Sequence, residues 1–245
     1  MEKTKKYEMG YDLHTHTIYS HGTGSIEDNV KAAIAKGMSH IAISDHGPGH
    51  RFYGIKREDV PKMREEIEAL NRKYPQIQIR LSVEANIVKN GNHLDVTPEE
   101  YDQYDFVIAG YHYGIPGCYS ISNWIWGHGL KLGEKRLKTK NTDMVIKALY
   151  ENDISILTHP GDKGPFDILH IAEACADTDT LMEINTRHPH LTVEEIKIAA
   201  RTDAQFIISS DAHSPERVGD FESGLVRAKE AGLDLSRIVN LREKK

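Results

Sequence analysis

The chain has 245 residues with 31 basic and 37 acidic side chains, which gives a formal net charge of −6 at pH 7. This acidic balance argues against a broad nucleic-acid surface and leaves room only for a local basic groove. No stretch approaches the ~20 apolar residues of a membrane span, and the charged residues 1–6 lack the apolar run of a signal peptide. We therefore expect a cytoplasmic protein with one domain over residues 1–245, a length that α/β barrels often reach.

Short apolar runs alternate with amphipathic segments along the whole sequence. The runs predict strands at residues 10–16, 40–46, 77–86, 105–112, 154–159, 181–185 and 206–211. The amphipathic segments predict helices at residues 25–37, 57–73, 143–152, 165–176, 192–200 and 221–232, with a short helix from Pro98 and a hairpin over 87–96. Repeated β-α units indicate a parallel sheet with helical crossovers. The expected fold is an α/β, TIM-like barrel with seven strands, one unit short of eight.

Residues that can bind metal ions gather at the ends of these strands, where barrels of this kind carry their chemistry. Six strands end in such residues, and the strand at 181–185 ends in Glu183 and Asn185. With one further histidine just after the first strand, the candidate ligands are His14, His16, His21, His46, Glu84, His112, His159, Asp211 and His213. A solvated or satisfied histidine is the ordinary explanation at one strand end, but the repetition favours a shared metal site.

Nine ligands are too many for one ion, because a zinc ion takes three or four protein ligands. If Glu84 bridges two ions, nine residues satisfy three ions and leave positions for water and substrate. The two cysteines, Cys118 and Cys175, form no C-x-x-C motif, so neither a thiolate site nor a disulfide framework is indicated.

Six short motifs occur in one order along the chain: D-L-H-T-H, S-D-H-G, V-E-A-N, A-G-Y-H, T-H-P-G and S-S-D-A-H. In this order they resemble the PHP (polymerase and histidinol phosphatase) family, most closely its YcdX-type phosphatase branch, over about residues 11–239. The resemblance implies a distorted (β/α)7 barrel with a trinuclear metal centre.

Carried over motif by motif, the resemblance also implies three sets of ligands. His14, His16, Glu84 and Asp211 would hold the first ion, Glu84, His112 and His159 the second, and His21, His46 and His213 the third. Histidine and carboxylate ligands accept several divalent transition metals, so zinc is expected first, with manganese or iron as alternatives.

The function expected from this centre is the hydrolysis of small phosphomonoesters. Glu84 and Asp211 would hold the ions that activate a metal-bound hydroxide as the nucleophile, and the ions would clamp the phosphate oxygens. No interaction with a membrane is expected, and a homo-oligomer is possible.

Four other functions compete with this hypothesis. A histidinol-phosphatase is the nearest, because the motifs do not separate it from a general phosphatase. A 3'-5' exonuclease of the same family would want a basic track, and an amidohydrolase would want a bridging lysine at a strand end. A non-enzymatic metal-binding protein would be expected to tolerate ligand losses, whereas all nine positions are filled.

Further polar residues lie close to the expected ligands. Asp12 and Asp45 precede ligand histidines and are expected either to orient an imidazole ring or to form ordinary hydrogen bonds in the barrel wall. Glu183 and Asn185 are candidates for an outer-shell or water-binding role. Arg187 follows a strand end, and its guanidinium suits phosphate oxygens. Loop residues with the same ambiguity are Lys163, His188 and His190, whereas ordinary roles are expected for His40, His50, His93, His128 and His170.

The longest segment without a clear pattern is residues 113–138, directly after the ligand His112. It contains Trp124, Trp126 and a basic end. Irregular segments of this length are usually functional or disordered. We expect a flap over the substrate, with an oligomer contact as the main alternative.

Overall fold

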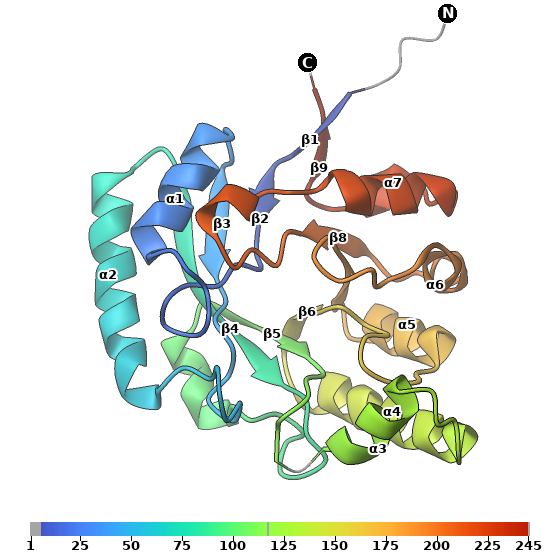
Figure 1. The fold of residues 1–245 in the computed structure, drawn as a ribbon. Coiled ribbons are helices and arrows are strands. Elements are labelled where there is room, and N and C mark those ends of the chain that lie inside the picture. Colours follow the sequence, from blue (N-terminus) through green and yellow to red (C-terminus); the bar gives the residue numbers. More distant parts are fainter. Residues whose placement is uncertain (1–5, 117, 245) are drawn as a thin grey trace, which may run out of the picture.

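Seven parallel strands form the central sheet of the computed structural model, which describes residues 6–116 and 118–244. Their order in the sheet, β2-β3-β4-β5-β6-β7-β8, is also their order in the sequence. The strands are β2 (Tyr11–Asp12), β3 (His40–Ile43), β4 (Gln78–Asn86), β5 (Phe106–Gly110), β6 (Ile154–Leu157), β7 (Leu181–Asn185) and β8 (Phe206–Ser209). Figure 1 shows that they curve around a common centre and that the helices lie outside them.

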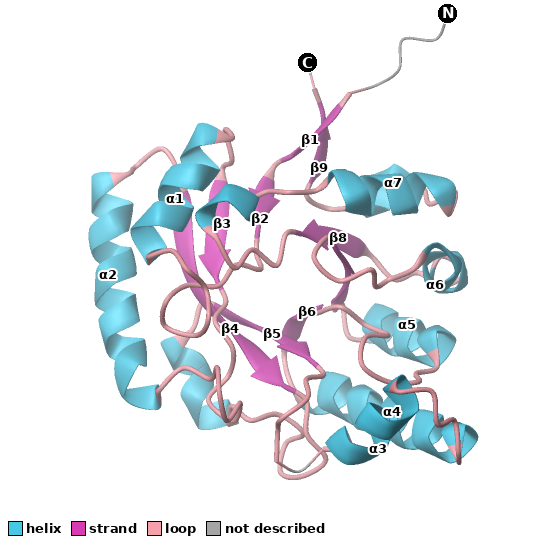
Figure 2. Ribbon diagram, viewed as in Figure 1, coloured by secondary structure: helices cyan, strands magenta, loops and turns pink. Residues whose placement is uncertain are grey.

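The helices connect successive strands and cover the outside of the sheet (Figure 2). The α-helices are α1 (Ile26–Ala35), α2 (Val60–Lys73), α3 (Ser120–Gly127), α4 (Glu134–Glu151), α5 (Ile168–Asp177), α6 (Val193–Ala199) and α7 (Glu222–Glu230). Short 3-10 turns are η1 (Arg57–Asp59), η2 (Pro98–Gln103), η3 (Pro215–Arg217) and η4 (Leu235–Arg237). Ser25 caps α1 through the predicted capping box with Asp28.

The barrel closes between β2 and β8 by two different contacts. Near the carboxyl ends, the N–H of His16 donates to the carbonyl of Ala212 at 2.8 Å. Near the amino ends, the side chain of Asn240 lies between the two strands. Its amide oxygen accepts from the N–H of Ile208, and its amide nitrogen donates to the carbonyls of Ile208 (2.7 Å) and Tyr11 (2.9 Å). Asn240 therefore forms hydrogen bonds with backbone groups of β2 and β8 that an eighth strand would otherwise pair.

Two apolar regions support the sheet. The large outer core packs the helices against the strands, as the buried residues Val60, Met63, Ile67 and Leu70 of α2 illustrate. A small separate cluster of Ile108, Ile156 and Ile207 is fully buried among β5, β6 and β8. Side chains alternate along a strand, so Glu183 shares the face of Leu181, which packs against this cluster.

The two ends of the described chain pair with each other. β1 (Tyr7–Met9) and β9 (Leu241–Glu243) form a two-stranded antiparallel sheet in which Tyr7 lies opposite Glu243. β1 leads directly into β2, so the pair lies at the amino-terminal side of the barrel (Figure 1). Neither strand was expected from the sequence, because each has only three residues.

The barrel and its seven strands confirm the fold predicted from the sequence, with differences in the extent of the elements. β2 is two residues long rather than seven, because the chain leaves the ladder before His14. The 87–96 hairpin is reduced to one bridge between Ile87 and Leu94. The expectation of an irregular segment at 113–138 is wrong, since α3 and the first turn of α4 lie within it. No helix of the described residues has the length and apolarity needed to cross a membrane.

Candidate metal centre

Four ligand atoms converge at the carboxyl ends of the strands, on side chains that follow β2 or β8 or belong to β4. The Nε2 atoms of His14 and His16 lie 3.0 Å apart. The Oε2 of Glu84 lies 3.4 and 3.7 Å from these two nitrogens, and Oδ1 of Asp211 lies 3.8 and 3.2 Å from them. Four donors about 2.1 Å from a tetrahedral ion would be roughly 3.4 Å apart. His14, His16 and Asp211 therefore offer three close donors for one divalent ion, with Oε2 of Glu84 beside the two histidines.

The two carboxylate oxygens of Glu84 face different histidines. Oε2 lies 2.8 Å from Nδ1 of His46, whereas Oε1 lies 3.3 Å from Nε2 of His112 and 3.0 Å from Nε2 of His159. The hydroxyl of Thr158 also donates to Oε1 at 2.7 Å. The geometry thus allows Glu84 to serve two neighbouring ions, one at each oxygen.

A glycine makes room for this carboxylate. A β-carbon on Gly110, at the end of β5, would lie 2.1 Å from the hydroxyl oxygen of Thr158 and 3.2 Å from Oε1 of Glu84. The A-G-Y-H motif therefore supplies the candidate ligand His112 and also a glycine that leaves space for the Glu84 carboxylate.

Glu183 fixes the orientation of the His14 ring through the ring nitrogen that points away from the other candidate ligands. Its Oε1 accepts from Nδ1 of His14 at 2.7 Å, so Nδ1 carries the proton and Nε2 faces the other donors. Its Oε2 accepts from the backbone N–H of His159 at 2.7 Å and from the amide of Asn185 at 2.9 Å. The carboxylate is fully buried and orients two candidate ligands. Sequence analysis left its role open, although its position at a strand end pointed to it.

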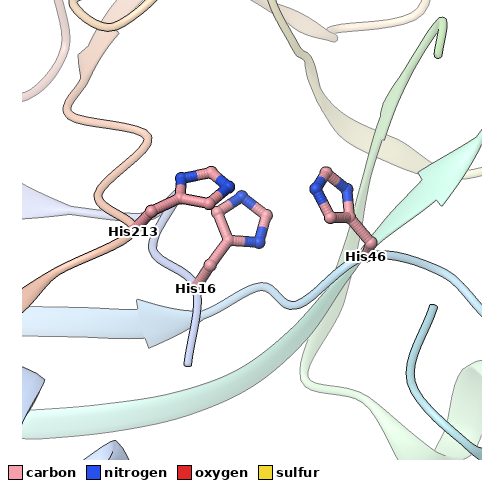
Figure 3. A group of neighbouring side chains, drawn as sticks. All are labelled: His16, His46 and His213. Atoms are coloured by element: carbon pink, nitrogen blue, oxygen red, sulfur yellow. The ribbon is translucent and has the colours of Figure 1, made fainter. Parts of the chain in front are cut away.

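Three groups of residues have ligand atoms that all lie within 4.8 Å of one another. The groups are His14 with His16 and Asp211, His46 with Glu84 and His112, and His16 with His46 and His213. Figure 3 shows that the last three rings come from separate segments and lie close together. His21 is outside these groups, yet its ring centroid lies 4.1 Å from that of His213 and 4.8 Å from that of His46. His159 is also outside them, despite its approach to Glu84.

Several of these atoms are buried without a hydrogen-bond partner among the described residues. They are Nδ1 of His16, His21, His46 and His112, Nε2 of His213, and Oε2 of Glu84. The approach of His46 to Glu84 is short, but its geometry is not that of a hydrogen bond. Burying an unpaired polar atom costs about 1–3 kcal/mol, so a cluster of them is expected where a metal ion supplies the missing partners.

The charges around His14 raise its pKa. Burial disfavours the charged ring, but the carboxylates of Glu183, Glu84 and Asp211 outweigh burial and move its pKa well above 6.5. Burial also disfavours ionised Glu84 and Asp211, yet neighbouring histidines hold both pKa values well below normal. A metal ion bound here would displace the proton of His14, so its binding should release that proton.

Burial and neighbouring histidines lower the pKa of other imidazole rings in the cluster. They lower the pKa of His21 to about 3, and the pKa of His16 falls well below 6.5. These rings are neutral at pH 7, which is the form that binds a metal.

The aspartates beside the ligand histidines hold backbone and hydroxyl groups instead of imidazoles. Asp12 accepts from the N–H groups of His14, Ser210 and Gly219. Asp45 is buried and accepts from the N–H and hydroxyl of Thr17 and from the hydroxyl of Ser20. Of the two expected roles, the hydrogen bonds in the barrel wall are the ones found. Asp45 thereby shapes the loop that leads to His21.

A cavity of about 370 Å³ opens over the ligands. Its walls include His21, His46, His112, His159, Asp211 and His213, together with Arg187, Lys163, His188, His50, Phe52, Tyr53, Tyr113 and Gly114. His50, for which an ordinary role was expected, belongs to this wall. His190 is not among these wall residues. Among the described residues of 113–138, only Tyr113 and Gly114 line the cavity, and no residue of α3 does.

His188 occupies a position between two carboxylates. Its Nδ1 lies 3.3 Å from Oδ2 of Asp162, and its Nε2 lies 3.5 Å from Oδ2 of Asp211. Burial, His159 and Lys163 lower its pKa to about 4. The ring is therefore neutral at pH 7 and is held in the cavity wall.

The sequence profile of the PHP domain matches residues 12–194. The chain belongs to the PHP domain family. Its relatives include the Probable phosphatase YcdX of Escherichia fergusonii, which is 26% identical, with 94% of this chain and 89% of the relative covered. The DNA polymerase/3'-5' exonuclease PolX of Bacillus subtilis is 27% identical over 96% of this chain, which spans only 39% of PolX.

Solved structures share the PHP barrel at low sequence identity. A histidinol phosphate phosphatase of Lactococcus lactis, solved with zinc, L-histidinol and phosphate, has a TM-score of 0.62 and 17% identity, with 92% of this chain and 94% of that chain covered. A candidate histidinol phosphatase of Listeria monocytogenes has a TM-score of 0.67 and 16% identity, covering 85% and 97%. At these identities the two structures establish the fold.

Proposed function

We propose that this PHP protein is a metal-dependent phosphatase that hydrolyses phosphomonoesters at a centre of three divalent ions. The observation that carries the proposal is the convergence of buried imidazole rings on Glu84, beside further buried ring nitrogens that have no hydrogen-bond partner among the described residues. The similarity to probable phosphatases supports the reaction class, and zinc in the Lactococcus lactis structure supports zinc as the first metal to test.

The ligand sets proposed are those implied by the family motifs. His14, His16, Glu84 and Asp211 would hold the first ion, and Glu84, His112 and His159 the second. The third would be held by His21, His46 and His213, whose rings lie close together. Bound divalent ions supply a water of lowered pKa and positive charge against the phosphate oxygens.

The remaining residues of the cavity would bind and orient the substrate. Arg187 and Lys163 are the cations of the wall, and a guanidinium can donate to two phosphate oxygens at once. The backbone N–H groups of Arg187 and His188 both donate to Oδ1 of Asn185 at 2.8 Å, which fixes the start of this loop. We expect Arg187→Ala to raise KM while metal content stays unchanged.

The substrate class is tested with metal-loaded protein and a panel of esters. Phosphomonoesters, including phenyl phosphate, histidinol phosphate and sugar phosphates, are compared with bis(p-nitrophenyl) phosphate and single-stranded DNA. We expect hydrolysis of monoesters to exceed that of both diesters. Preferential cleavage of DNA would replace the proposal with a nuclease like the PolX relative, and cleavage of none would remove it.

Metal content gives the first quantitative prediction. Protein purified without chelators is expected to contain up to three transition-metal ions per chain, measured by inductively coupled plasma mass spectrometry. Treatment with a chelator should abolish hydrolysis, and added zinc or manganese should restore it. One ion or none in protein never exposed to chelator would contradict the trinuclear centre.

The raised pKa of His14 gives a prediction about pH. Without metal, the stability from charged His14 is complete below its unfolded pKa of about 6.5 and is lost as pH rises through the raised folded value. Metal binds the neutral ring, so the increase in Tm on adding zinc should be larger at pH 8 than at pH 6. Activity should fall in acid and be partly restored by excess metal. Acid inactivation with every ion retained would point to a different titrating group.

A further inference from the structure

The loop at residues 47–54, between β3 and η1, lies at the edge of the cavity and is held by hydrogen bonds between its own residues. The N–H of Gly54 donates to the carbonyl of His50 at 3.0 Å. The N–H groups of Phe52 and Tyr53 donate to Nδ1 of the His50 ring at 3.4 and 3.2 Å. These hydrogen bonds fix the backbone positions of Phe52 and Tyr53.

The partly buried carboxylate of Asp95 anchors the base of the same loop. Oδ2 of Asp95 accepts from the N–H of Gly49 at 2.7 Å and from the side-chain amide of Asn86 at 2.6 Å. A β-carbon on Gly49 would lie 2.8 Å from this oxygen, so only glycine allows the contact without a shift. The loop is therefore attached to the end of β4, two residues after Glu84.

The two aromatic residues of the loop differ in their surroundings. The Tyr53 ring stacks on His21 and His50, with centroids 4.4 and 4.9 Å apart. The Phe52 side chain is 78% exposed, and its nearest ring is Tyr53, at 6.3 Å. Both line the cavity over the metal ligands. A single exposed apolar residue is ordinary on a surface, but here it stands on a fixed loop at the mouth of the candidate active site.

Phe52 also marks the boundary between two hollows. Phe52 and Gly114 line both the cavity over the ligands and a neighbouring hollow of about 430 Å³ that includes Ile115 and Ile121. Gly114 has φ +79, and a β-carbon there would lie 3.9 Å from a ring carbon of Phe52. The glycine thus keeps the space beside the phenyl ring free of a side chain. The apolar side chains of Phe52, Ile115 and Ile121 thus lead outward from the cavity over the ligands.

We propose that Phe52 selects phosphomonoesters whose alcohol carries a planar aromatic ring. This inference rests on the proposed function: the phosphate lies at the metal ligands, and the ring of the leaving group packs against Phe52. An aromatic group is favoured over an aliphatic one because Tyr53, His21 and His50 already form a stacked wall beside it, and rings prefer offset or edge contacts with rings. Arg187 and Lys163 supply the charge for the phosphate end.

Binding of unreactive phosphonates tests the inference without relying on hydrolysis. Isothermal titration calorimetry of the metal-loaded protein compares benzylphosphonate, which carries the ring, with methylphosphonate, which lacks it. Phe52→Ala should weaken benzylphosphonate binding roughly fivefold to tenfold and leave methylphosphonate binding unchanged. Phe52→Trp should retain the preference. The matched control is Val226→Ala, because Val226 is an exposed apolar residue on α7, away from the cavity.

Kinetic measurements separate the role of Phe52 from the proposed phosphatase activity. With phenyl phosphate and methyl phosphate as substrates, Phe52→Ala should lower kcat/KM for the aryl ester only, by a similar factor. Equal losses for both esters, or no loss for either, would overturn the role of Phe52 while leaving the phosphatase proposal intact. Failure of the wild-type protein to hydrolyse any monoester would instead remove the proposed function.

Discussion

Glu84→Gln is expected to remove two metal ions together and to lower kcat by at least about a thousandfold, the upper range for one lost electrostatic group. Oε2 of Glu84 faces His14, His16 and His46, and Oε1 faces His112 and His159. An amide has one oxygen and no charge, so it cannot accept from both sides. Two cations a few ångströms apart would then repel each other without the shared negative charge.

The measurement is metal content per chain together with kcat on a phosphomonoester. His21→Ala provides the contrast, because His21 lies at the edge of the cluster and should cost at most the third ion. That variant should retain a partly active centre. A Glu84→Gln protein with its full metal content and normal kcat would mean that the bridge is another residue.

Glu183→Gln is expected to weaken metal binding by about 10–100-fold, although Glu183 is not itself assigned as a ligand. Its carboxylate is ionised, because burial, which raises its pKa, is outweighed by His14 and His159. The amide can accept from either the ring of His14 or the backbone N–H of His159, but its NH₂ group would face the other donor. One candidate ligand would therefore lose its orientation.

Competition with a chromogenic zinc chelator measures this effect. Glu194→Gln is the matched control, since Glu194 is exposed on α6 and, among the described residues, forms an ion pair with Lys197 alone. The control should bind zinc as the wild type does. Unchanged zinc affinity in Glu183→Gln would show that His14 needs no support from behind.

Much of the barrel and of the ligand cluster could be predicted because both follow from repeated local signals. Apolar runs marked each strand, and His46, Glu84 and Asp211 stood where those runs ended. Parallel strands bring such ends together whatever the details of the loops. The prediction therefore did not depend on knowing where β2 ends, which is four residues before the end of the predicted strand.

What could not be predicted depends on contacts between distant segments. Asp45 precedes a ligand histidine, yet the loop at Thr17 and Ser20 brings other donors to its carboxylate. His50 looked ordinary because its place in the cavity wall is set by the fold of its loop and by Asp95. α3 escaped notice because Trp124 and Ile121 are exposed, so the segment lacks the apolar stripe of a packed helix.

The pairing of β1 with β9 has a consequence for how this barrel can be joined to other proteins. Tyr7 and Glu243 lie opposite each other, on the side of the barrel away from the candidate ligands. A neighbouring domain could therefore enter and leave the barrel at one place, with neither connection crossing the substrate entrance. The same geometry favours circular permutation: a short linker could join the two ends, and new ends could be opened in an exposed loop.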